Sequence, residues 1–308
     1  MTAHLALVGP TASGKSMLAL AVAEGLGDVE IVSMDSMQVY RGMDIGTAKP
    51  TTVDRSRIPH HMIDLAGPAE SWSVVRFRDA AREVVAAIEE RGRRALLAGG
   101  TGLYVQAVID DLRFPGDDPA LRADLEEETR TSSGLARAYA RLGELDPVAA
   151  WRIDGHNRRR IVRALEVTLS TGQLFSSFGP GVGTFGPSVF PVSMAGVWLP
   201  RRVVAARIEA RVAAMRDRGL VEEVRELLDA PGGLGRTASQ AIGYADIAHA
   251  LENSATVGDD VFAAIARRTR SFARRQRMWF RRDPRVTWYG TAGNPDALTP
   301  ALLAGWKR

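Results

Sequence analysis

The sequence has 308 residues and a formal net charge of +4, with 45% hydrophobic residues, 25% charged residues and no cysteine. This composition is that of an ordinary globular protein with one large or two smaller domains, and the lack of cysteine excludes disulfides, thiolate metal sites and a catalytic thiol. No apolar run approaches the roughly 18 residues of a membrane span, and the N-terminus shows no signal sequence, so we expect a cytoplasmic protein without a membrane partner.

The first apolar stretch, residues 5–8, predicts a buried strand that runs directly into a phosphate-binding loop. Residues 9–16 read GPTASGKS and fit the pattern G-x-x-x-x-G-K-[ST] at every defined position. The glycines let backbone N–H groups converge on a phosphate, a helix over about residues 15–26 adds the positive end of its dipole, and Lys15 adds a mobile charge. Ser16 can hold a Mg²⁺ ion. The loop alone does not tell whose phosphate is bound.

A second strand, over residues 29–33, leads into an acidic residue, Asp35. Ligands of open parallel sheets lie beyond the carboxyl ends of the strands, so we expect Asp35 to lie beside the phosphate loop. Its carboxylate could bind Mg²⁺ through water, take a proton from a nucleophile, or merely cap a turn.

The next elements are a crossover helix over residues 72–91 and a strand over residues 94–98, followed by the turn GGTGLY at residues 99–104. The glycines allow the backbone to approach a ligand closely, and Thr101 offers a hydroxyl at an expected helix start. A simple capping turn would have the same sequence.

The pattern then changes from alternating strands and helices to helices alone. From about residue 114 to residue 171 there is no strand signal, a glycine- and proline-rich cluster follows at 179–187, and a strand resumes over 189–199. We therefore predict an α/β fold, a P-loop NTPase-like parallel sheet flanked by helices, with an all-helical insertion domain. The predicted boundaries are 1–112 and 189–308 for the core domain and 113–188 for the insertion domain.

The remainder, residues 201–282, is predicted to be helical, and a stripe of arginines lies on one face of its last part; a final strand is predicted over 286–289. The stripe consists of Arg267, Arg270, Arg274, Arg277 and Arg281, widened by Arg268, Arg275 and Arg282, and the apolar residues Ile265, Phe272, Trp279 and Phe280 point the other way. Because the run contains no acidic partner, a nucleic-acid backbone is the favoured ligand. A solvated charged face and a membrane-surface helix are the alternatives.

Seven blocks, which follow one another along nearly the whole chain, resemble the tRNA dimethylallyltransferase family, also called the tRNA isopentenyltransferases. The blocks are GPTASGKS (9–16), DSMQVYRGMDIGTAKP (35–50), HHMID (60–64), GGTGLY (99–104), RRIVRALEV (159–167), QAIGY (240–244) and RQRMWFRR (275–282). Members of this family transfer the dimethylallyl group of dimethylallyl diphosphate to N6 of the adenine just 3′ of the anticodon and release pyrophosphate. The resemblance thus implies this activity, with Mg²⁺ as cofactor and with dimethylallyl diphosphate and the tRNA anticodon stem-loop as partners. We also expect a monomer. Met278 and Met17 depart from the family pattern at positions without a catalytic role.

The resemblance also assigns roles to individual residues. Asp35, Arg211 and Thr11 are the expected catalytic residues, with Asp35 removing a proton from the adenine amine as the new C–N bond forms. The diphosphate is expected on Gly9, Thr11, Ala12, Ser13, Gly14, Lys15 and Ser16, and Ser16 is also the expected Mg²⁺ ligand. Contacts with tRNA are expected from Asp35, Ser36, Met37, Gln38, Thr101, Arg122, Arg159, Arg160, Ile161, Val162, Arg163, Gln240, Ala241, Ile242, Gly243, Tyr244, Arg274 and Arg277. For Arg211 the alternative is a solvent-facing arginine, since Arg207 lies one helical turn earlier; for the tRNA contacts it is an ordinary surface arginine or turn.

Three other functions share part of this pattern. An isopentenyltransferase acting on free adenine nucleotides would share the phosphate loop and the Asp35 segment but would not need a grip on an anticodon loop. A P-loop kinase would turn over ATP without a prenyl donor. An RNA-binding regulator with a vestigial phosphate site would keep all of its function without Asp35.

Overall fold

The structure is a computed structural model that describes residues 3–178, 181–253 and 256–307. It divides into two compact units, a core unit formed by Met1–Asp111 and Phe185–Arg308 and an insertion unit formed by Leu112–Thr184. Residues 179 and 180, which belong to the predicted glycine- and proline-rich cluster, lie outside the described residues. None of the helices in the described ranges is long and apolar enough to cross a membrane.

The core unit is built on a six-stranded parallel sheet with the strand order β3-β2-β4-β1-β5-β6. The strands are β1 (His4–Val8), β2 (Val29–Ser33), β3 (His60–His61), β4 (Arg94–Gly99), β5 (Val192–Trp198) and β6 (Val286–Gly290). The predicted parallel sheet is confirmed, and each of the predicted strands is present. The two-residue strand β3, at the edge of the sheet, was not predicted.

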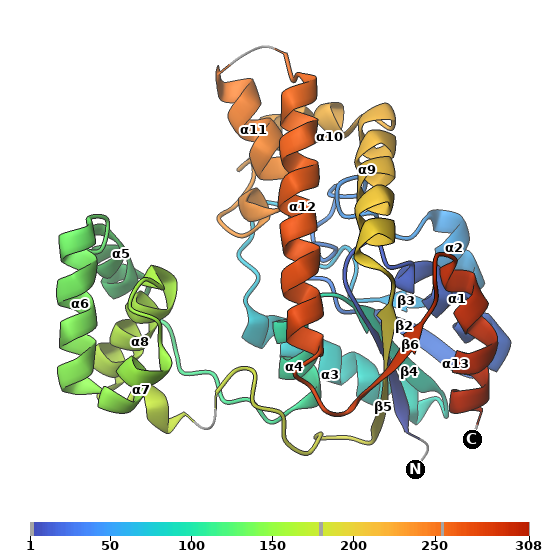
Figure 1. Cartoon of the computed structure of the whole chain (residues 1–308), viewed down its shortest axis with the longest axis horizontal. Coiled ribbons are helices and arrows are strands. Elements are labelled where there is room, and N and C mark those ends of the chain that lie inside the picture. The colour runs from blue at the N-terminus through green and yellow to red at the C-terminus, as the bar shows by residue number, and fades with distance from the viewer. Residues whose placement is uncertain (1–2, 179–180, 254–255, 308) are drawn as a thin grey trace. The chain divides into compact units, whose positions relative to one another are not determined.

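Helices cover both faces of this sheet, with α1 and α13 on one side and α3, α4, α9 and α12 on the other (Figure 1). The helices of the core unit are α1 (Lys15–Leu26), α2 (Thr52–Arg57), α3 (Val74–Glu90), α4 (Gly102–Ile109), α9 (Arg201–Asp217), α10 (Leu220–Asp229), α11 (Tyr244–Asn253), α12 (Asp259–Phe280) and α13 (Thr299–Trp306), with short 3₁₀ helices η2 (Ala238–Gln240) and η3 (Pro295–Leu298). Successive side chains of β1 alternate between the two faces: Leu5 and Leu7 pack on the side of α1, and Ala6 and Val8 on the side of α3. Burial on both faces explains why these strands are continuous apolar runs.

The strand order decides which loops meet. Strand β4 pairs with β1 on one side and with β2 on the other, so that Val8 lies beside Gly99 and Ser33 lies beside Ala98. Parallel strands end at the same edge of a sheet. The phosphate loop, the glycine turn at 99–102 and the segment that begins at Asp35 are therefore neighbours, although they are far apart in the sequence.

The insertion unit consists of helices only, as the sequence pattern indicates for this part of the chain. Its elements are α5 (Pro119–Glu128), α6 (Ser132–Leu145), α7 (Pro147–Arg152), α8 (Arg158–Thr171) and the 3₁₀ helix η1 (Phe175–Ser177). It has a hydrophobic core of its own, in which Leu142 and Leu165 are fully buried. Because side chains of these helices supply that core, the insertion unit buries its apolar faces without borrowing from the sheet.

Two segments of the core unit that flank the insertion are joined by a short antiparallel bridge. Asp110 pairs with Ser188, and the N–H of Val189 donates to the carbonyl of Ile109 at 2.8 Å. Arg285 reinforces this bridge, since its guanidinium donates to the Asp110 carboxylate at 2.5 Å and to the carbonyl of Gly186 at 3.0 Å.

Candidate functional site

The phosphate loop has the backbone conformation of an anion-binding turn. Gly9, Ala12 and Gly14 have φ angles of 156°, 61° and 87°, and α1 begins directly after Gly14. Concave loops in which left-handed residues alternate with right-handed ones present successive N–H groups to an anion, and the helix adds its positive end. Ser13 is fully buried within the loop, whereas Ser16 is exposed in the first turn of α1.

Two side chains from distant helices hold the loop in this conformation, and neither was predicted to do so. Gln276 of α12 accepts a hydrogen bond from the N–H of Thr11 through Oε1 at 2.8 Å, and Arg207 of α9 donates through Nε to the carbonyl of Ala12 at 2.9 Å. Gln276 is 7% exposed. The sequence shows Arg207 one turn before Arg211, but only the fold brings it to the carbonyl of Ala12.

Lys15, Arg211 and Asp35 form a coupled charge centre at the loop. Burial and the neighbouring Arg211 guanidinium lower the pKa of Lys15 to about 8, although the Asp35 carboxylate opposes both effects. Burial also lowers the pKa of Arg211, again opposed by Asp35. Arg211 is half-buried and faces this centre, so the alternative of a solvent-facing helical arginine does not describe it. Two cations beside one carboxylate leave a local excess of positive charge that suits an anionic ligand.

The Asp35 carboxylate stabilises a turn of its own segment while it belongs to the charge centre. Its Oδ1 accepts the N–H of Met37 at 2.9 Å, which fixes the carboxylate at the end of β2. Ser36 and Met37 are half-buried next to it. The predicted turn function is therefore present, and it orients the side chain rather than replacing a role in the charge centre.

The glycine turn after β4 is packed so closely that larger residues would not fit. A Cβ on Gly100 would lie 2.4 Å from Nε2 of Gln276 and 3.0 Å from the carbonyl oxygen of Gly9, and a Cβ on Gly102 would lie 2.2 Å from the ring of Trp279. Thr101 is the N-cap residue of α4 but makes no side-chain capping hydrogen bond. Within the described residues, its hydroxyl thus serves no capping purpose at this turn, contrary to the simple capping interpretation.

The segment between Asp35 and Lys49 is locked by its own polar side chains. The hydroxyl of Ser33 donates to Oε1 of Gln38 at 2.7 Å, and Nε2 of Gln38 donates to the carbonyls of Thr47 and Ala48 at 3.2 and 3.4 Å. Gln38 was expected to contact tRNA, but its amide atoms are committed to this segment. Lys49 is buried and donates through Nζ to the carboxylates of Asp44 and Asp64, both at 2.6 Å.

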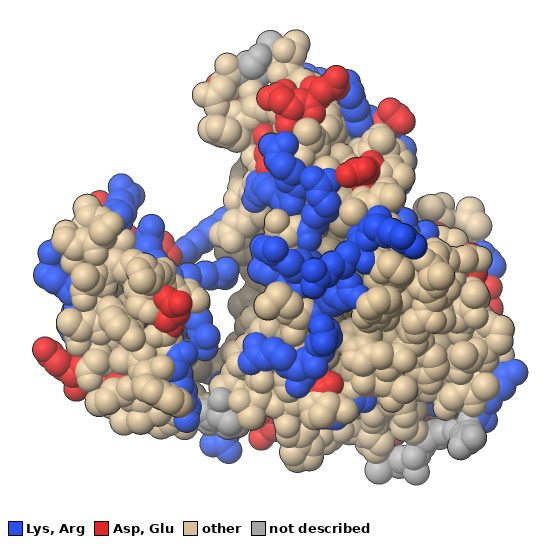
Figure 2. Space-filling model, viewed as in Figure 1, with Lys and Arg blue, Asp and Glu red and all other residues tan. Residues whose placement is uncertain are grey.

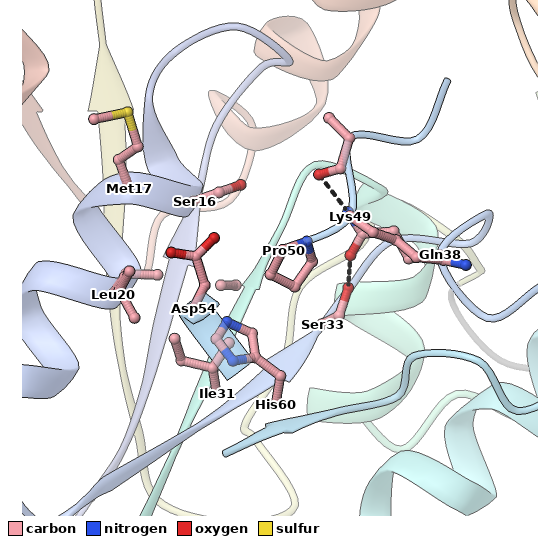
Figure 3. A pocket seen from close by; sticks show the side chains of 13 residues that line it. Ser16, Met17, Leu20, Ile31, Ser33, Gln38, Lys49, Pro50, Asp54 and His60 are labelled. Atoms are coloured by element: carbon pink, nitrogen blue, oxygen red, sulfur yellow. Dashed lines mark hydrogen bonds between the residues drawn. The ribbon is translucent and has the colours of Figure 1, made fainter. Parts of the chain in front are cut away.

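A pocket lies between α1 and this segment. Figure 3 shows Ser16, Asp54 and His60 around it, with Met17 and Leu20 of α1 on one side and Gln38 and Ser33, joined by a hydrogen bond, on the other. Asp54 also belongs to the capping box of α2, where it accepts hydrogen bonds from the N–H and hydroxyl of Thr51. The end of the phosphate loop, at Ser16, thus lines a pocket that has both polar and apolar walls.

Glu223 of α10 forms hydrogen bonds with the backbone of residues 44–46 in the same segment. Its carboxylate accepts the N–H groups of Asp44, Ile45 and Gly46 at 3.0, 2.8 and 3.3 Å, and the hydroxyl of Tyr244 at 2.5 Å. Tyr244 is fully buried, and this burial, together with the neighbouring Glu223 carboxylate, raises its pKa. The expectation that the Tyr244 side chain meets tRNA is therefore wrong, because this side chain is enclosed between α10 and the segment.

The other residues of the predicted 240–244 contact divide by exposure. Ala241 and Gly243 are buried, Ile242 is half-buried and Gln240 is exposed. Only Gln240 and Ile242 present side-chain surface to a macromolecule. The packing of η2 and α11 therefore explains the residue types at the buried positions of this block.

The arginines of α12 gather into a basic band on the core unit (Figure 2). Two of them have acidic partners from neighbouring helices: Arg268 donates to Asp246 at 2.5 Å and Arg270 to Glu209 at 2.9 Å. Arg277 lies 4.4 Å above the ring of Trp198, and its pKa is lowered by burial and by the guanidinium groups of Arg201 and Arg281. The sequence correctly places the band on one face, but it could not reveal the acids that neutralise part of it.

The arginines predicted to bind tRNA from the insertion unit fall into two groups. Arg122 and Arg163 both bind the fully buried carboxylate of Glu166, at 2.7 and 2.9 Å. This network joins α5 to α8, so these two arginines have a structural function. By contrast, Arg159 and Arg160 are exposed in the first turn of α8.

Two apolar members of the same predicted set are core residues. Ile161 is 0% exposed and Val162 is 3% exposed, and both pack inside the insertion unit. Side-chain contacts with tRNA from these positions are therefore wrong. The periodicity of the block RRIVRALEV reflects a helix with one buried face.

Comparison with known proteins finds relatives that match most of the chain. The sequence profile described as IPP transferase matches residues 38–283. A tRNA dimethylallyltransferase of Pseudarthrobacter chlorophenolicus is 48% identical and covers 92% of both chains, and one of Streptomyces coelicolor is 47% identical over 92% of this chain and 89% of its own.

Solved structures agree with these sequences. The crystal structure of the full-length tRNA isopentenylpyrophosphate transferase of Bacillus halodurans has a TM-score of 0.71 at 36% identity, covering 100% of this chain and 97% of its own. A eukaryotic dimethylallyltransferase acting on tRNA, at 23% identity, has the same fold with a TM-score of 0.79 over 99% of this chain and 78% of its own. Together with the charge centre at the phosphate loop, the extent of these matches establishes that the chain belongs to the IPP transferase family.

Proposed function

We propose that this protein transfers the dimethylallyl group of dimethylallyl diphosphate to N6 of the adenosine 3′ of the anticodon in tRNA. The observation that carries the proposal is the charge centre, in which Lys15 and Arg211 lie beside Asp35 at the phosphate loop. The names of the relatives, tRNA dimethylallyltransferases and isopentenylpyrophosphate transferases, support it.

The two cations and the loop account for the departure of pyrophosphate. As the C1–O bond of the donor breaks, negative charge develops on the diphosphate, and Lys15, Arg211 and the loop N–H groups lie where they can stabilise it. Thr11, whose N–H is fixed by Gln276, presents its side chain from the same loop. A preformed cationic seat of this kind lowers the barrier without reorganising at the moment of reaction.

Asp35 accounts for the other half of the reaction. The adenine amine is a weak nucleophile, because its lone pair is delocalised into the ring. As the N6–C1 bond forms, the proton leaves N6 for the Asp35 carboxylate, while the electron pair of the C1–O bond goes to pyrophosphate. The hydrogen bond from the N–H of Met37 holds that carboxylate in place.

Mg²⁺ fits the residues at this site. Ser16 offers an exposed hydroxyl at the start of α1, and no group of three or more His, Asp or Glu side chains among the described residues could hold a metal by itself. Mg²⁺ commonly binds through few protein ligands together with substrate phosphates and water. When bound by Ser16 and the diphosphate, it would neutralise charge on the leaving group.

Binding of tRNA is proposed for two surfaces, each described on its own. The core unit offers the basic band, in which Arg274 is exposed and has no ion pair within the described ranges. The insertion unit offers Arg159 and Arg160. An anticodon loop whose target base is turned outward needs such a grip on its backbone.

The test is a transfer assay with labelled dimethylallyl diphosphate and either tRNA or AMP. We expect label in tRNA only, and we expect Asp35→Asn to slow transfer by about 10²- to 10⁴-fold, the contribution of a general base, with tRNA affinity nearly unchanged. Asp79→Asn, at an exposed carboxylate on α3, is the matched control and should transfer normally. Label in AMP alone would favour the free-nucleotide enzyme, and ATP turnover without a prenyl donor would favour a kinase.

A further inference from the structure

The most exposed of the large hydrophobic side chains in the described ranges is Trp151, on α7 of the insertion unit. It is 87% exposed, whereas Trp72 and Trp306 are 6% and 5% exposed in the core unit. Val148 and Leu145, three and six residues earlier, are also exposed, at 47% and 38%. Tryptophan is highly buried on average, so an indole held almost wholly in solvent beside other apolar side chains marks a contact surface.

The backbone that carries Trp151 is held rigidly. Asp146 is fully buried and caps α7 by accepting the N–H of Ala149 at 3.0 Å, and its other oxygen accepts the N–H of Ser176 at 2.8 Å. At the other end of α7, the hydroxyl of Tyr139 donates to the carbonyls of Ala150 and Ile153 at 2.9 and 3.2 Å. An aromatic side chain on a fixed backbone loses little further entropy when a ligand covers it.

Four of the five exposed charged residues that follow Trp151, between residues 152 and 160, are arginines. Arg152 is exposed directly after it, and after a short turn Arg158, Arg159 and Arg160 are exposed in the first turn of α8. Cations at a helix N-terminus face the positive end of the helix dipole, so this placement does not stabilise α8. Asp154 is the exposed acid of the turn, and it is already used to accept the N–H of His156 at 2.8 Å.

We propose that Trp151 is a stacking platform for an unpaired base of the bound RNA, with the adjacent arginines on the flanking phosphates. Indole faces stack on bases, and guanidinium groups neutralise the backbone on either side. A second copy of this chain is disfavoured as the occupant, since a symmetric contact through this surface would place like-charged arginines against each other. The inference rests on the proposed function, because it assumes that the protein binds tRNA.

The experiment uses the full chain and two RNA probes, an anticodon stem-loop and a hairpin of the same stem closed by a minimal loop. We expect Trp151→Ala to weaken binding of the stem-loop by about 5- to 150-fold, the range for loss of one base–aromatic stack, and to leave the minimal hairpin nearly unaffected. Trp151→Phe should restore most of the affinity. Leu228→Ala, at an exposed leucine on α10 of the core unit, is the control and should leave the affinity unchanged.

Salt dependence separates stacking from charge. Trp151→Ala should leave the slope of log affinity against log salt unchanged, whereas Arg159→Ala with Arg160→Ala should reduce the slope. Unchanged stem-loop affinity in Trp151→Ala would overturn the inference while the proposed function stands; no binding of either probe by the unaltered protein would overturn the proposed function itself. A dimer in sedimentation that Trp151→Ala converts to monomer would assign the surface to self-association instead.

Discussion

Replacing Gln276 by methionine tests whether the arginine-rich helix α12 holds the phosphate loop in its binding conformation. Methionine has nearly the same length but cannot accept the N–H of Thr11, which Oε1 of Gln276 accepts at 2.8 Å. Leaving a buried donor without a partner costs about 1–3 kcal/mol, which corresponds to roughly a 5- to 150-fold change in an equilibrium constant. If the loop must recover that hydrogen-bonded conformation to bind diphosphate, the affinity for pyrophosphate should fall within this range.

The same contact can be broken from the opposite side. A Cβ on Gly100 would lie 2.4 Å from Nε2 of Gln276, so Gly100→Ala should displace the amide and weaken pyrophosphate binding as well. Because both substitutions disrupt one contact, the double variant should lose much less than the sum of the two single effects.

The assay is calorimetric titration of the full chain with pyrophosphate and Mg²⁺, without RNA. Met278→Gln is the control, since Met278 is 61% exposed on the same helix and should leave the affinity unaltered. Thermal unfolding checks that each variant is folded. Affinity of Gln276→Met within twofold of the unaltered protein, or full additivity of Gln276→Met and Gly100→Ala, would refute the proposed role.

Two further predictions concern pH and the insertion unit. The pKa of Lys15 is lowered to about 8, and a bound diphosphate raises it, so binding takes up a proton and the affinity for pyrophosphate should fall as the pH rises through 8. Lys15→Arg stays charged, so the affinity of this variant should change much less with pH. Equal pH profiles for the variant and the unaltered protein would contradict this origin. In the insertion unit, Glu166→Ala removes the buried partner of Arg122 and Arg163 and should cost about 3–5 kcal/mol in the free energy of unfolding, measured by urea denaturation. Arg122→Ala should likewise destabilise the protein while leaving the salt dependence of RNA binding unchanged; a reduced salt slope would return Arg122 to the RNA-binding residues.

Much of the fold could be predicted because its signals are local. The strand before residue 9 and the helix after residue 14 follow from an apolar run, a glycine pattern and helical periodicity, and all are found where expected. Strand β3 escaped prediction because His60–His61 is only two residues long and depends on pairing with Ile31 and Val32. No period can be recognised in two residues.

The candidate site was predictable where one segment supplies the chemistry and unpredictable where distant helices meet. Lys15 and Ser16 belong to a continuous motif, whereas the bond between Gln276 and Thr11 spans 265 residues. Buried ion pairs caused the opposite error, because arginines that form them were predicted to bind RNA. Arginines in a helical run indicate a basic surface, and the spacing of three residues between Arg163 and Glu166 was a readable sign of their ion pair. The pairing of Arg122 with the same carboxylate joins two helices and required the fold.

The bridge between Asp110 and Ser188 bears on how such a protein could have been assembled. Since the chain departs from and rejoins the sheet-bearing part at two hydrogen-bonded residues, a tight loop of a few amino acids could replace 112–184 without moving either end. Arg285, from a third segment of the chain, donates hydrogen bonds to both sides of this junction. The two ends of the core unit are therefore held together whatever is inserted between them. A helical module inserted at such a point can lengthen, shrink or diverge in sequence while the sheet-bearing unit keeps its fold.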